Sequence, residues 1–317
     1  MAIGLLESAI TAHLNAEMPQ LLTDAVGRND EIAAFFPSTL VKKPSIQWRV
    51  ISAGNSSFTS YGEGSPEPAA GAETRLKAEL AWKRIGGTVG IDIQILETTP
   101  GFELLGDTLK TEMAGALKSY LDQLSTQLVS DGTGNGGLDV TGILAAVSNS
   151  ITYAGLSRVT YAFWQSVVQA AQGGVLTLAQ MKSVSRQIRD GIRDGRVTHW
   201  VCNPTIFNLI GDLLEADTQK RIDISQTGAR AIGQGLSFEG GYRRLWFEGA
   251  EVIEVRGWPA QTLHALDMRE ISLEVVRDIK ANPPKQVADQ MSWFMPWSGQ
   301  LRCNHPGRQG VITGILG

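Results

Sequence analysis

The stretch YAGLSRVTYAFWQS, residues 153–166, gathers large aromatic side chains around a single arginine. Apolar residues at positions 164, 167, 168 and 171 recur at helical spacing, so we expect Trp164 to face a hydrophobic core. Arg158 is the only cation between Ser130 and Gln180, whereas a surface that stacks nucleic-acid bases needs several cations nearby. The stretch therefore favours structural core over a binding surface, with Arg158 passing beside the aromatic rings or stacking on one of them.

The composition is that of a folded protein. The chain has 317 residues, of which 43% are hydrophobic and 19% charged, and its length suits one large domain or two ordinary ones. The net charge of -4 argues against a protein that grips DNA through clustered cations. Two cysteines are too few for a disulfide framework and suit a reducing compartment. The N-terminal MAIGLLESAI has no basic start, so we expect no signal peptide. No apolar run approaches the roughly 18 residues that a membrane-spanning helix needs, so we expect no membrane span.

The N-terminal part changes its hydrophobic period. Residues 1–36 carry apolar residues at helical spacing and predict an arm-like helix, whereas SIQWRVI (45–51), KAELAWK (77–83) and TVGIDIQIL (88–96) alternate as strands do. A segment rich in Gly, Pro and Ala lies between the first two. These patterns predict a long hairpin-like extension. Because an isolated two-stranded ribbon is marginal in water, it should rest on another surface, and a neighbouring copy of the chain is one candidate.

A long helix should follow. Thr98 to Pro100 is a start signal, leucines then recur every three or four residues, and DGTGNGG (131–137) ends the pattern. A helix over 101–130 would span about 45 Å. The rest of the chain is predicted to mix helices and strands. A helix should follow Thr177, then a strand (197–202), a second helix (205–216) and a glycine-rich loop (225–241). Strand-like segments complete the chain at 245–255, 260–268, 271–276 and 300–315.

The glycines at 132–137 match the G-x-G-x-x-G sequence motif of a dinucleotide-binding loop. That loop must follow a strand and open a helix, whereas here the glycines follow a helix. We interpret them as a helix terminator.

The remaining candidate sites are weak. His199 with Cys202 and Cys303 with His305 could suggest zinc, but residues three apart on a strand point to opposite faces. We expect a buried Cys202 and an exposed His305 instead. Acidic and basic residues at 189–194 are typical of a solvated helix face. No nucleophile or phosphate-loop motif is present, so we expect no catalytic residue, no metal and no cofactor.

Three segments carry a resemblance in their order along the chain. GLDVTGI (137–143) precedes GLSRVTYAFW (155–164), VTHWVCNPTIFNLI (197–210) follows, and CNHPGRQGVITGI (303–315) closes the chain. In this order and architecture the sequence resembles the major capsid proteins of tailed bacteriophages with the Hong Kong 97-like fold.

The resemblance implies an α+β fold with an N-terminal arm, an extended β-hairpin loop, a long spine helix with a peripheral-domain sheet, and an α/β axial domain. The implied divisions are the arm (1–40), the extended loop (41–97), the peripheral domain (98–137 and 276–317) and the axial domain (138–275). The residues expected to support the structure or its interfaces are Trp48, Trp82, Arg158, Trp164, position 234 (a glutamine, Gln234, between two glycines) and Gly240.

The implied function is a major capsid protein that self-assembles into hexamers and pentamers of an icosahedral or prolate head enclosing double-stranded DNA. Implied partners are further copies of the chain, a separate scaffold protein (because the arm begins near Met1), a portal, a decoration protein, and DNA contacted non-specifically. The location would be the virion capsid, assembled in the bacterial host cytoplasm. Some relatives crosslink a lysine to an asparagine. Lys77 or Lys83 with Asn304 are conceivable partners, but we expect no crosslink. An encapsulin-type compartment shell and an α/β enzyme remain the alternatives.

Overall fold

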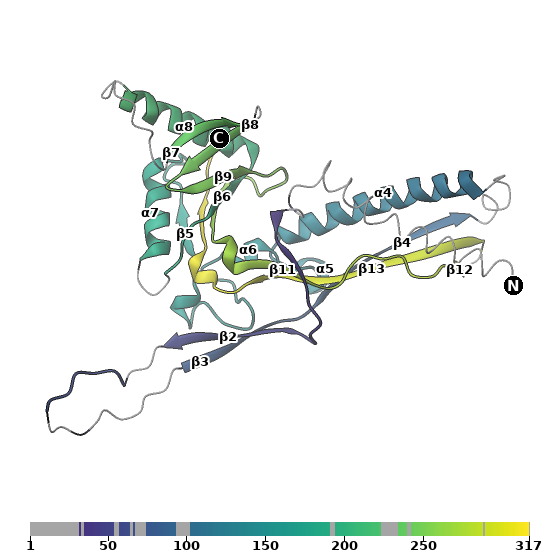
Figure 1. Ribbon diagram of the computed structural model, residues 1–317, viewed down its shortest axis with the longest axis horizontal. Helices are drawn as coiled ribbons and strands as arrows, with labels where there is room; N and C mark the ends of the chain where they lie inside the picture. The colour runs from purple at the N-terminus through teal and green to yellow at the C-terminus, as the bar shows by residue number, and fades with distance from the viewer. Residues whose placement is uncertain are drawn as a thin grey trace.

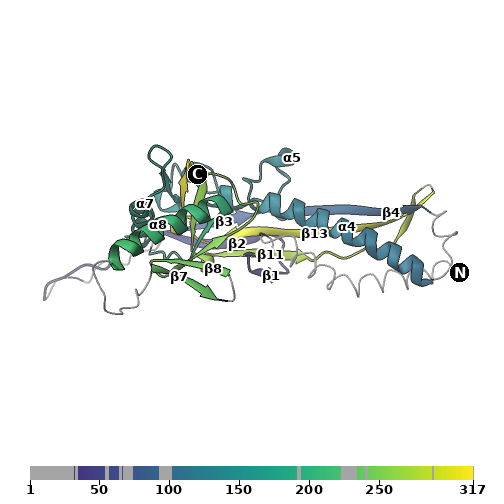
Figure 2. The same ribbon diagram turned by 90° about the horizontal axis from the view of Figure 1, so that it is seen from above.

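The computed structural model describes residues 32, 35–53, 57–63, 66, 74–92, 102–190, 194–222, 234–239, 242–287 and 289–316. The molecule is drawn out along one axis (Figures 1 and 2). An elongated limb of one helix and long strands occupies one end, a larger sheet with its own helices occupies the other, and a two-stranded ribbon projects from the body.

The limb is built on α4 (Phe102–Leu128), β4 (Lys83–Asp92) and β13 (Gln290–Cys303). The strands β4 and β13 pair antiparallel from Asp92↔Gln290 to Lys83↔Gly299. The helix runs alongside them and buries one apolar stripe, which consists of Met113, Leu117, Leu121, Leu124 and Leu128. The long helix predicted over 101–130 is therefore present, and the sheet beside it covers its leucine face.

Three shorter strands complete the limb sheet: β1 (Ser38–Leu40), β11 (Ile271–Arg277) and β12 (Lys285–Val287). Their order is β1-β11-β13-β12, with β4 on the other side of β13. The sheet therefore joins the segment before the ribbon to the C-terminal part of the chain. The helix predicted over 1–36 lies outside the described residues except at its end, where Ile32 and Phe36 are buried.

The ribbon consists of β2 (Ile46–Ala53) and β3 (Thr74–Leu80), paired antiparallel. It is shorter than the extension predicted over 41–97, because residues 83–92 leave the ribbon and pair with β13 instead. Their apolar face, with Val89 and Ile91 buried, belongs to the core of the limb. Alternation in a sequence identifies a strand and its buried face but not the partner strand, which is why the sequence overextended the ribbon.

The larger sheet has the order β5-β14-β10-β6-β9-β8-β7 among the described residues. Its strands are β5 (Val167–Ala170), β6 (His199–Cys202), β7 (Gln234–Glu239), β8 (Tyr242–Phe247), β9 (Ala250–Glu254), β10 (Thr262–Leu266) and β14 (Gly310–Thr313). Its helices are α7 (Leu178–Arg189) and α8 (Pro204–Ile222). The helix predicted after Thr177 is present as α7, and Thr177 caps it in a reciprocal capping box with Gln180.

Three sequence predictions need correction here. The helical spacing after Trp164 is wrong, because residues 162–164 form a short 3-10 turn (Ala162–Trp164) and the next residues form β5, paired parallel with β14. The strand predicted over 245–255 is two strands joined by a tight turn in which Glu248 and Gly249 both have positive φ. The predicted helix of 205–216 extends to Ile222.

Short elements connect these parts: α5 (Gly134–Gly137), α6 (Ile143–Ala146) and 3-10 turns at Met268–Glu270 and Pro306–Arg308. The buried apolar residues form two clusters. One joins the limb, the ribbon root and the stretch around Trp164, and the other lies between the larger sheet and its helices. Among the described residues, no helix has the length and apolar character needed to cross a membrane.

Candidate assembly surfaces

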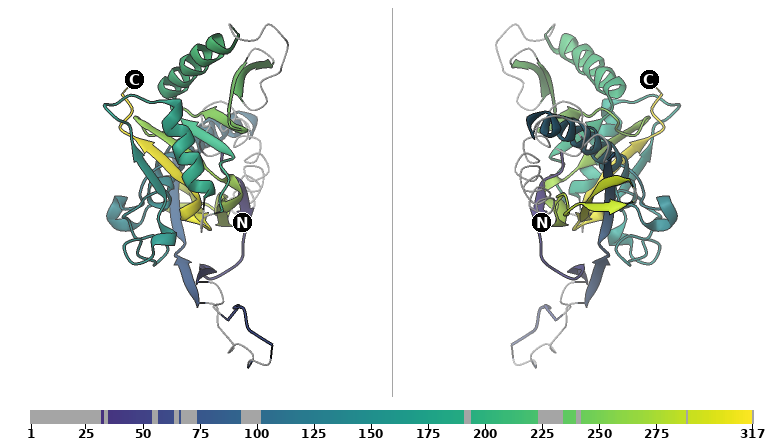
Figure 3. Two further views of the ribbon diagram at one scale, coloured as in Figure 1. Left: turned by 90° about the vertical axis from the view of Figure 1, so that its left-hand side faces the viewer. Right: turned by 90° about the vertical axis from the view of Figure 1, so that its right-hand side faces the viewer.

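The ribbon root is fastened to the body by its apolar face. Ile46, Val50, Ala78 and Leu80 are buried there, on one side of the two paired strands, as the alternating pattern predicted. The backbone N–H of Glu79 also donates to the carbonyl of Ala154, 3.0 Å away. The ribbon is therefore anchored along its first half, and its far half extends beyond the body (Figure 3).

Trp48 connects the ribbon to the end of β13. Its indole N–H donates to the carbonyl of Asn304 at 3.1 Å, and the Arg302 guanidinium lies 4.9 Å from its ring centroid. Arg302 in turn donates to Glu274, 2.6 Å away, in a mostly buried ion pair. The predicted role of Trp48 as a structural residue agrees with these contacts, whereas Arg302 and Glu274 were not identified from the sequence, because their positions carry no motif.

Trp82 lies in the break between β3 and β4. It is half-buried, and its indole N–H donates to the carbonyl of Lys43 at 2.9 Å. This bond holds the entrance of the ribbon next to its exit. Trp82 was expected to share a strand face with Ala78 and Leu80, but β3 ends at Leu80.

The outward face of the ribbon is polar and mostly cationic. Arg49 lies directly opposite Lys77, and Lys77 forms an ion pair with Glu79 at 2.8 Å. Hydrogen bonds from Lys77, Gln47 and Ser45 lower the pKa of Glu79 to about 2. The Glu79 carboxylate therefore stays ionised across the physiological pH range.

The far end of the ribbon carries exposed aromatic side chains. Phe58 is 88% exposed and Tyr61 is 66% exposed. Single apolar residues on a surface are common, but two aromatics at the tip of a projecting ribbon are typical of a contact surface. Neither residue was identified as a candidate from the sequence.

Arg158 is the centre of the stretch that carries the resemblance. It is fully buried, and it donates to the carbonyls of Ala146 (2.6 Å), Ala145 (2.8 Å), Ile151 (3.1 Å) and Trp164 (3.2 Å). No carboxylate of the described residues pairs with it, and burial lowers its pKa to about 10. Of the two arrangements expected for Arg158, passing beside the aromatic rings toward the surface does not occur, because the side chain is fully buried. The guanidinium joins two loops by satisfying their carbonyl groups.

Aromatic residues enclose this arginine. Its guanidinium carbon lies 5.6 Å from the ring centroid of Tyr153, so the expected stacking on a ring is present. Trp164 is fully buried, as predicted, and its indole N–H donates to the Tyr153 carbonyl at 3.2 Å. The Tyr153 hydroxyl accepts the backbone N–H of Cys303 at 2.9 Å. The stretch is structural core that ties the 145–165 region to the end of β13.

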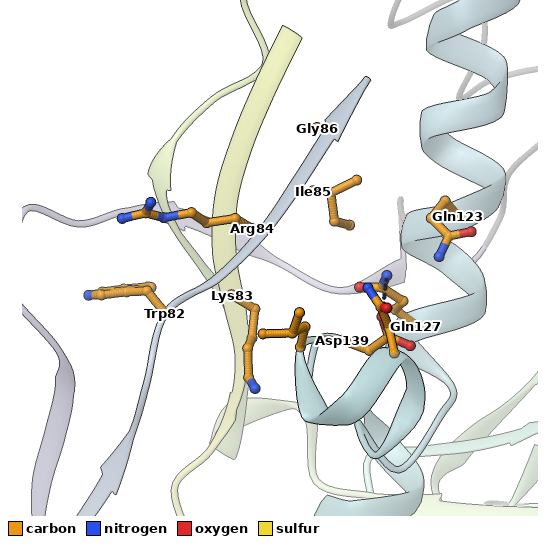
Figure 4. A pocket seen from close by; sticks show the side chains of 10 residues that line it. Trp82, Lys83, Arg84, Ile85, Gly86, Gln123, Gln127 and Asp139 are labelled. Carbon is orange, nitrogen blue, oxygen red and sulfur yellow. Dashed lines mark hydrogen bonds between the residues drawn. The ribbon is translucent and has the colours of Figure 1, made fainter. Parts of the chain in front are cut away.

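A groove of about 580 Å³ lies between β4, the C-terminal half of α4 and the glycine-rich turn that follows this helix. Figure 4 shows that Ile85 points across it toward Gln123, whereas Trp82 and Arg84 leave the other face of the strand. Lys83 donates through its Nζ to the carbonyl of Gly137. The groove thus combines an apolar wall with amides and cations.

The glycine-rich turn that forms one wall ends α4, as predicted. Gly132, Gly136 and Gly137 all have positive φ, which L side chains rarely adopt. Gln127 steadies the turn by donating to Asp139 at 3.0 Å and accepting from the backbone N–H of Val140 at 3.0 Å. This glycine-rich turn therefore forms one wall of the groove.

The His and Cys residues considered as zinc ligands do not come together in the structure as a metal site. Cys202 and Cys303 are both buried, and burial raises the pKa of each thiol. His305 is half-buried rather than exposed, because it precedes the buried turn at Pro306. Within the described ranges, no three His, Cys, Asp or Glu side chains are placed to hold a metal.

Position 234 and Gly240 belong to the predicted loop at 225–241. Gln234 begins β7 and pairs with Phe247, so the loop interpretation is wrong for 234–239. Gly240 lies outside the described residues. Of the lysines considered for a crosslink, Lys83 bonds Gly137 and Lys77 bonds Glu79, and the Asn304 Oδ1 is buried with no hydrogen-bond partner among the described residues.

Sequence comparison and structure comparison differ in what they find. No protein-family model matches the chain, and no curated protein sequence matches it. Solved structures do match. The cyanophage A-1(L) capsid asymmetric unit has a TM-score of 0.64 at 17% identity, covering 92% of this chain and 93% of that one.

Other capsid-type structures match over a similar share. The chain from Mycobacterium phage Adephagia has a TM-score of 0.55 at 14% identity, with 90% of each chain covered. The SrpI encapsulin from Synechococcus elongatus PCC 7942 has a TM-score of 0.55 at 8% identity, covering 89% of this chain and 86% of that one. The α+β, Hong Kong 97-like fold predicted from the sequence is therefore confirmed.

Proposed function

We propose that the chain is a major capsid protein of a tailed bacteriophage. Copies self-assemble into hexamers and pentamers of an icosahedral or prolate head that encloses double-stranded DNA. The role is structural, with no catalytic residue, no metal and no cofactor. Its location is the virion capsid, with assembly in the bacterial host cytoplasm.

One observation carries the proposal: the match to the cyanophage A-1(L) capsid asymmetric unit extends over 92% of the chain. A ribbon whose far half leaves the body and ends in exposed aromatics has little support within its own chain. Neighbouring copies in a closed shell supply that support. Many modest contacts, repeated by symmetry, then give the shell its strength.

The divisions of the chain follow from this proposal. Residues 1–40 act as the arm, 98–137 and 276–317 as the peripheral domain, and 138–275 as the axial domain around the capsomer centre. The pairing of β14 with β5 and β10 supports moving residues 310–313 from the peripheral to the axial domain. The pairing of β4 with β13 supports moving residues 83–92 from the extended loop to the peripheral domain. Trp48, Trp82, Arg158 and Trp164 then position the ribbon and the core, and residues 234–240 lie toward the capsomer centre.

Further partners belong to the same proposal. We expect a separate scaffold protein and a portal, and a decoration protein on the outer surface. The net charge of -4 suits a wall that encloses DNA without gripping it. Lys77, Lys83 and Asn304 form no covalent crosslink, so denaturing gels should show only the single chain.

The test is particle formation. The chain is expressed alone and with candidate scaffold proteins from the same source, and the products are examined by negative-stain microscopy and light scattering. We expect closed shells on the order of tens of nanometres across, or sheets and tubes of capsomers. A monodisperse species of a few chains under both conditions would instead favour an enzyme or another small oligomer.

An encapsulin-type shell is the second candidate, because the SrpI encapsulin matches at the same TM-score as several phage chains. Both functions predict closed particles. Particles purified from the source organism separate them: nuclease-protected, genome-length DNA supports a phage head, whereas a co-purified enzyme inside nucleic-acid-free particles supports a compartment.

A further inference from the structure

Asn135 is the only asparagine of the chain that is followed by glycine. An asparagine side chain can react with the backbone of the next residue, because the backbone nitrogen of that residue and the side-chain Cγ close a five-membered ring. Glycine in the second position hinders this ring closure least, since it has no Cβ. The Asn135–Gly136 pair therefore has the sequence for a reaction that needs no second protein.

The fold leaves both residues of this pair open to solvent. Asn135 and Gly136 are exposed in the glycine-rich turn after α4, and a Cβ built on Gly136 would meet nothing within 4 Å. Both have positive φ, 50° and 67°, as in the type I′ turn that Asn-Gly favours. Among the described residues, no acceptor is hydrogen-bonded to the backbone N–H of Gly136. The attacking nitrogen and the surrounding water are thus both available.

Most other described asparagines lack one of these conditions. Asn203 and Asn282 precede prolines, whose backbone nitrogen carries no proton. Asn208 lies within α8, and the side-chain oxygen of Asn304 is buried. None of these four residues offers an exposed side chain next to an unhindered backbone N–H.

Asn149 is the best comparison, because it is exposed as Asn135 is. It is followed by Ser150 rather than glycine, and the backbone N–H of Ser150 donates to the hydroxyl of Ser148 at 3.2 Å. The nitrogen that would attack Asn149 is therefore both hindered by a side chain and held in a hydrogen bond.

We propose that Asn135 is a self-modification site, at which the folded chain turns the side-chain amide into a carboxylate. The deprotonated backbone nitrogen of Gly136 attacks Cγ of Asn135, a C–N bond forms, and the side-chain nitrogen takes up a proton and leaves as ammonia. Water then opens the cyclic imide at one of its two carbonyl groups, which yields aspartate or isoaspartate. No oxidant, reductant or cofactor takes part, and the chain gains one negative charge.

The new charge alters the groove beside α4. Asn135 lines this groove, whose charged lining residues are Lys83, Arg84 and Asp139. The reaction therefore adds a second carboxylate opposite two cations. The isoaspartate product also lengthens the main chain by one carbon, in a turn that Lys83 holds at the carbonyl of Gly137. The groove wall of an aged chain thus differs from that of a fresh chain, and this difference does not depend on the proposed function.

Ageing of the purified chain tests the site. The folded chain is kept in mildly alkaline buffer, sampled over time, denatured and digested with trypsin, and a sample taken at the start corrects for conversion during digestion. Residues 119–158 form one peptide that contains both Asn135 and Asn149, because no lysine or arginine lies between Lys118 and Arg158. Electron-transfer fragmentation locates the change and separates aspartate from isoaspartate. We expect conversion at Asn135 to rise with time, with both products present, while Asn149 stays unconverted.

Two variants make the test specific. Asn135→Gln keeps an uncharged amide but would need a six-membered ring, so ion-exchange chromatography should show no acidic form that grows with time. Gly136→Ala keeps the asparagine and adds a Cβ next to the attacking nitrogen, so conversion should be several-fold slower than in the parent chain. Thermal unfolding of each variant shows that the comparison is made on folded chains.

The parent chain unfolded in guanidinium chloride provides the reference, because its Asn135 reacts without help or hindrance from the fold. A folded chain that stays unconverted while the unfolded chain reacts would overturn the inference, and so would equal conversion at Asn135 and Asn149. Neither result bears on particle formation, which tests the proposed function separately.

Discussion

The guanidinium of Arg302 lies over the indole of Trp48, 4.9 Å from its ring centroid, and so connects the last strand of the limb to the ribbon. The two residues are far apart in the sequence. The contact fixes the direction in which the ribbon leaves the body, because Trp48 also donates to the carbonyl of Asn304. A cation over an aromatic ring and a hydrogen bond to a backbone group together restrict both the position and the tilt of the indole.

Removing this contact should loosen the ribbon root. Trp48→Ala loses the cation–π contact and the hydrogen bond, at a cost of about 2 kcal/mol to ribbon docking. Hydrogen exchange of the β2 and β3 amides, measured on the unassembled chain, should accelerate, while exchange in the larger sheet stays unchanged. Arg49→Ala on the outward face is the matched control and should leave exchange close to that of the parent chain. Equal acceleration in both variants would contradict the role of Trp48.

Replacing the buried arginine should destabilise the core. Arg158→Met removes the donors for four carbonyl groups and should lower the free energy of unfolding by about 3 kcal/mol or more. Arg158→Lys keeps the charge but not the planar fork of donors, so it should recover only part of the loss. Urea unfolding followed by circular dichroism measures both. Arg186→Lys on the exposed face of α7 is the control, and a Lys variant as stable as the parent would show that the fork is unimportant.

Gly142 has no room for a side chain. A Cβ there would lie 2.6 Å from the carbonyl oxygen of Ser130 and would also meet those of Gln127 and Leu128, which are backbone atoms at the end of α4. Gly142→Ala should therefore cost about 2–3 kcal/mol, because the helix end has to shift. Gly87→Ala is the matched control, since a Cβ there meets nothing within 4 Å. Thermal unfolding compares the two, and equal melting temperatures would contradict the close approach.

His264 should make stability depend on pH. It is fully buried, accepts the indole N–H of Trp258 at 3.0 Å through Nδ1, and burial lowers its pKa from 6.5 to about 3. The unfolded chain therefore takes up a proton below about pH 6.5 that the folded chain refuses until about pH 3, so stability is present above pH 6.5 and is lost as the pH falls. The loss by pH 5 should be about 2 kcal/mol.

His264→Asn keeps an acceptor for Trp258 and cannot titrate. The variant is less stable overall, but its free energy of unfolding should fall less between pH 7.5 and pH 5 than that of the parent chain. Other groups, such as Asp267 with its lowered pKa, contribute equally to both chains and cancel in the comparison. Identical pH profiles would contradict a neutral, buried His264.

The local patterns in the sequence determined much of this protein. The leucine spacing after Pro100 placed α4 to within two residues at each end, and the alternation around Trp48 and Ala78 placed the ribbon strands with the correct buried face. The helical spacing after Thr177 placed α7, and the glycines after Asp131 placed the end of the long helix. These features depend on residues close in sequence, through helical or strand periodicity and backbone freedom, so one segment contains all the information needed.

Contacts between distant segments decided the rest. Residues 83–92 were predicted to belong to the hairpin-like extension, and only the pairing with β13 and the apolar side of α4 assigned them to the limb. The segment after Trp164 has helical spacing, yet pairing with β14 made it a strand. The sequence left open whether Arg158 passes beside the aromatic rings or stacks on one, and only the folded chain places four backbone carbonyl groups around it. Strand pairing and burial depend on partners far along the chain, which no local pattern encodes.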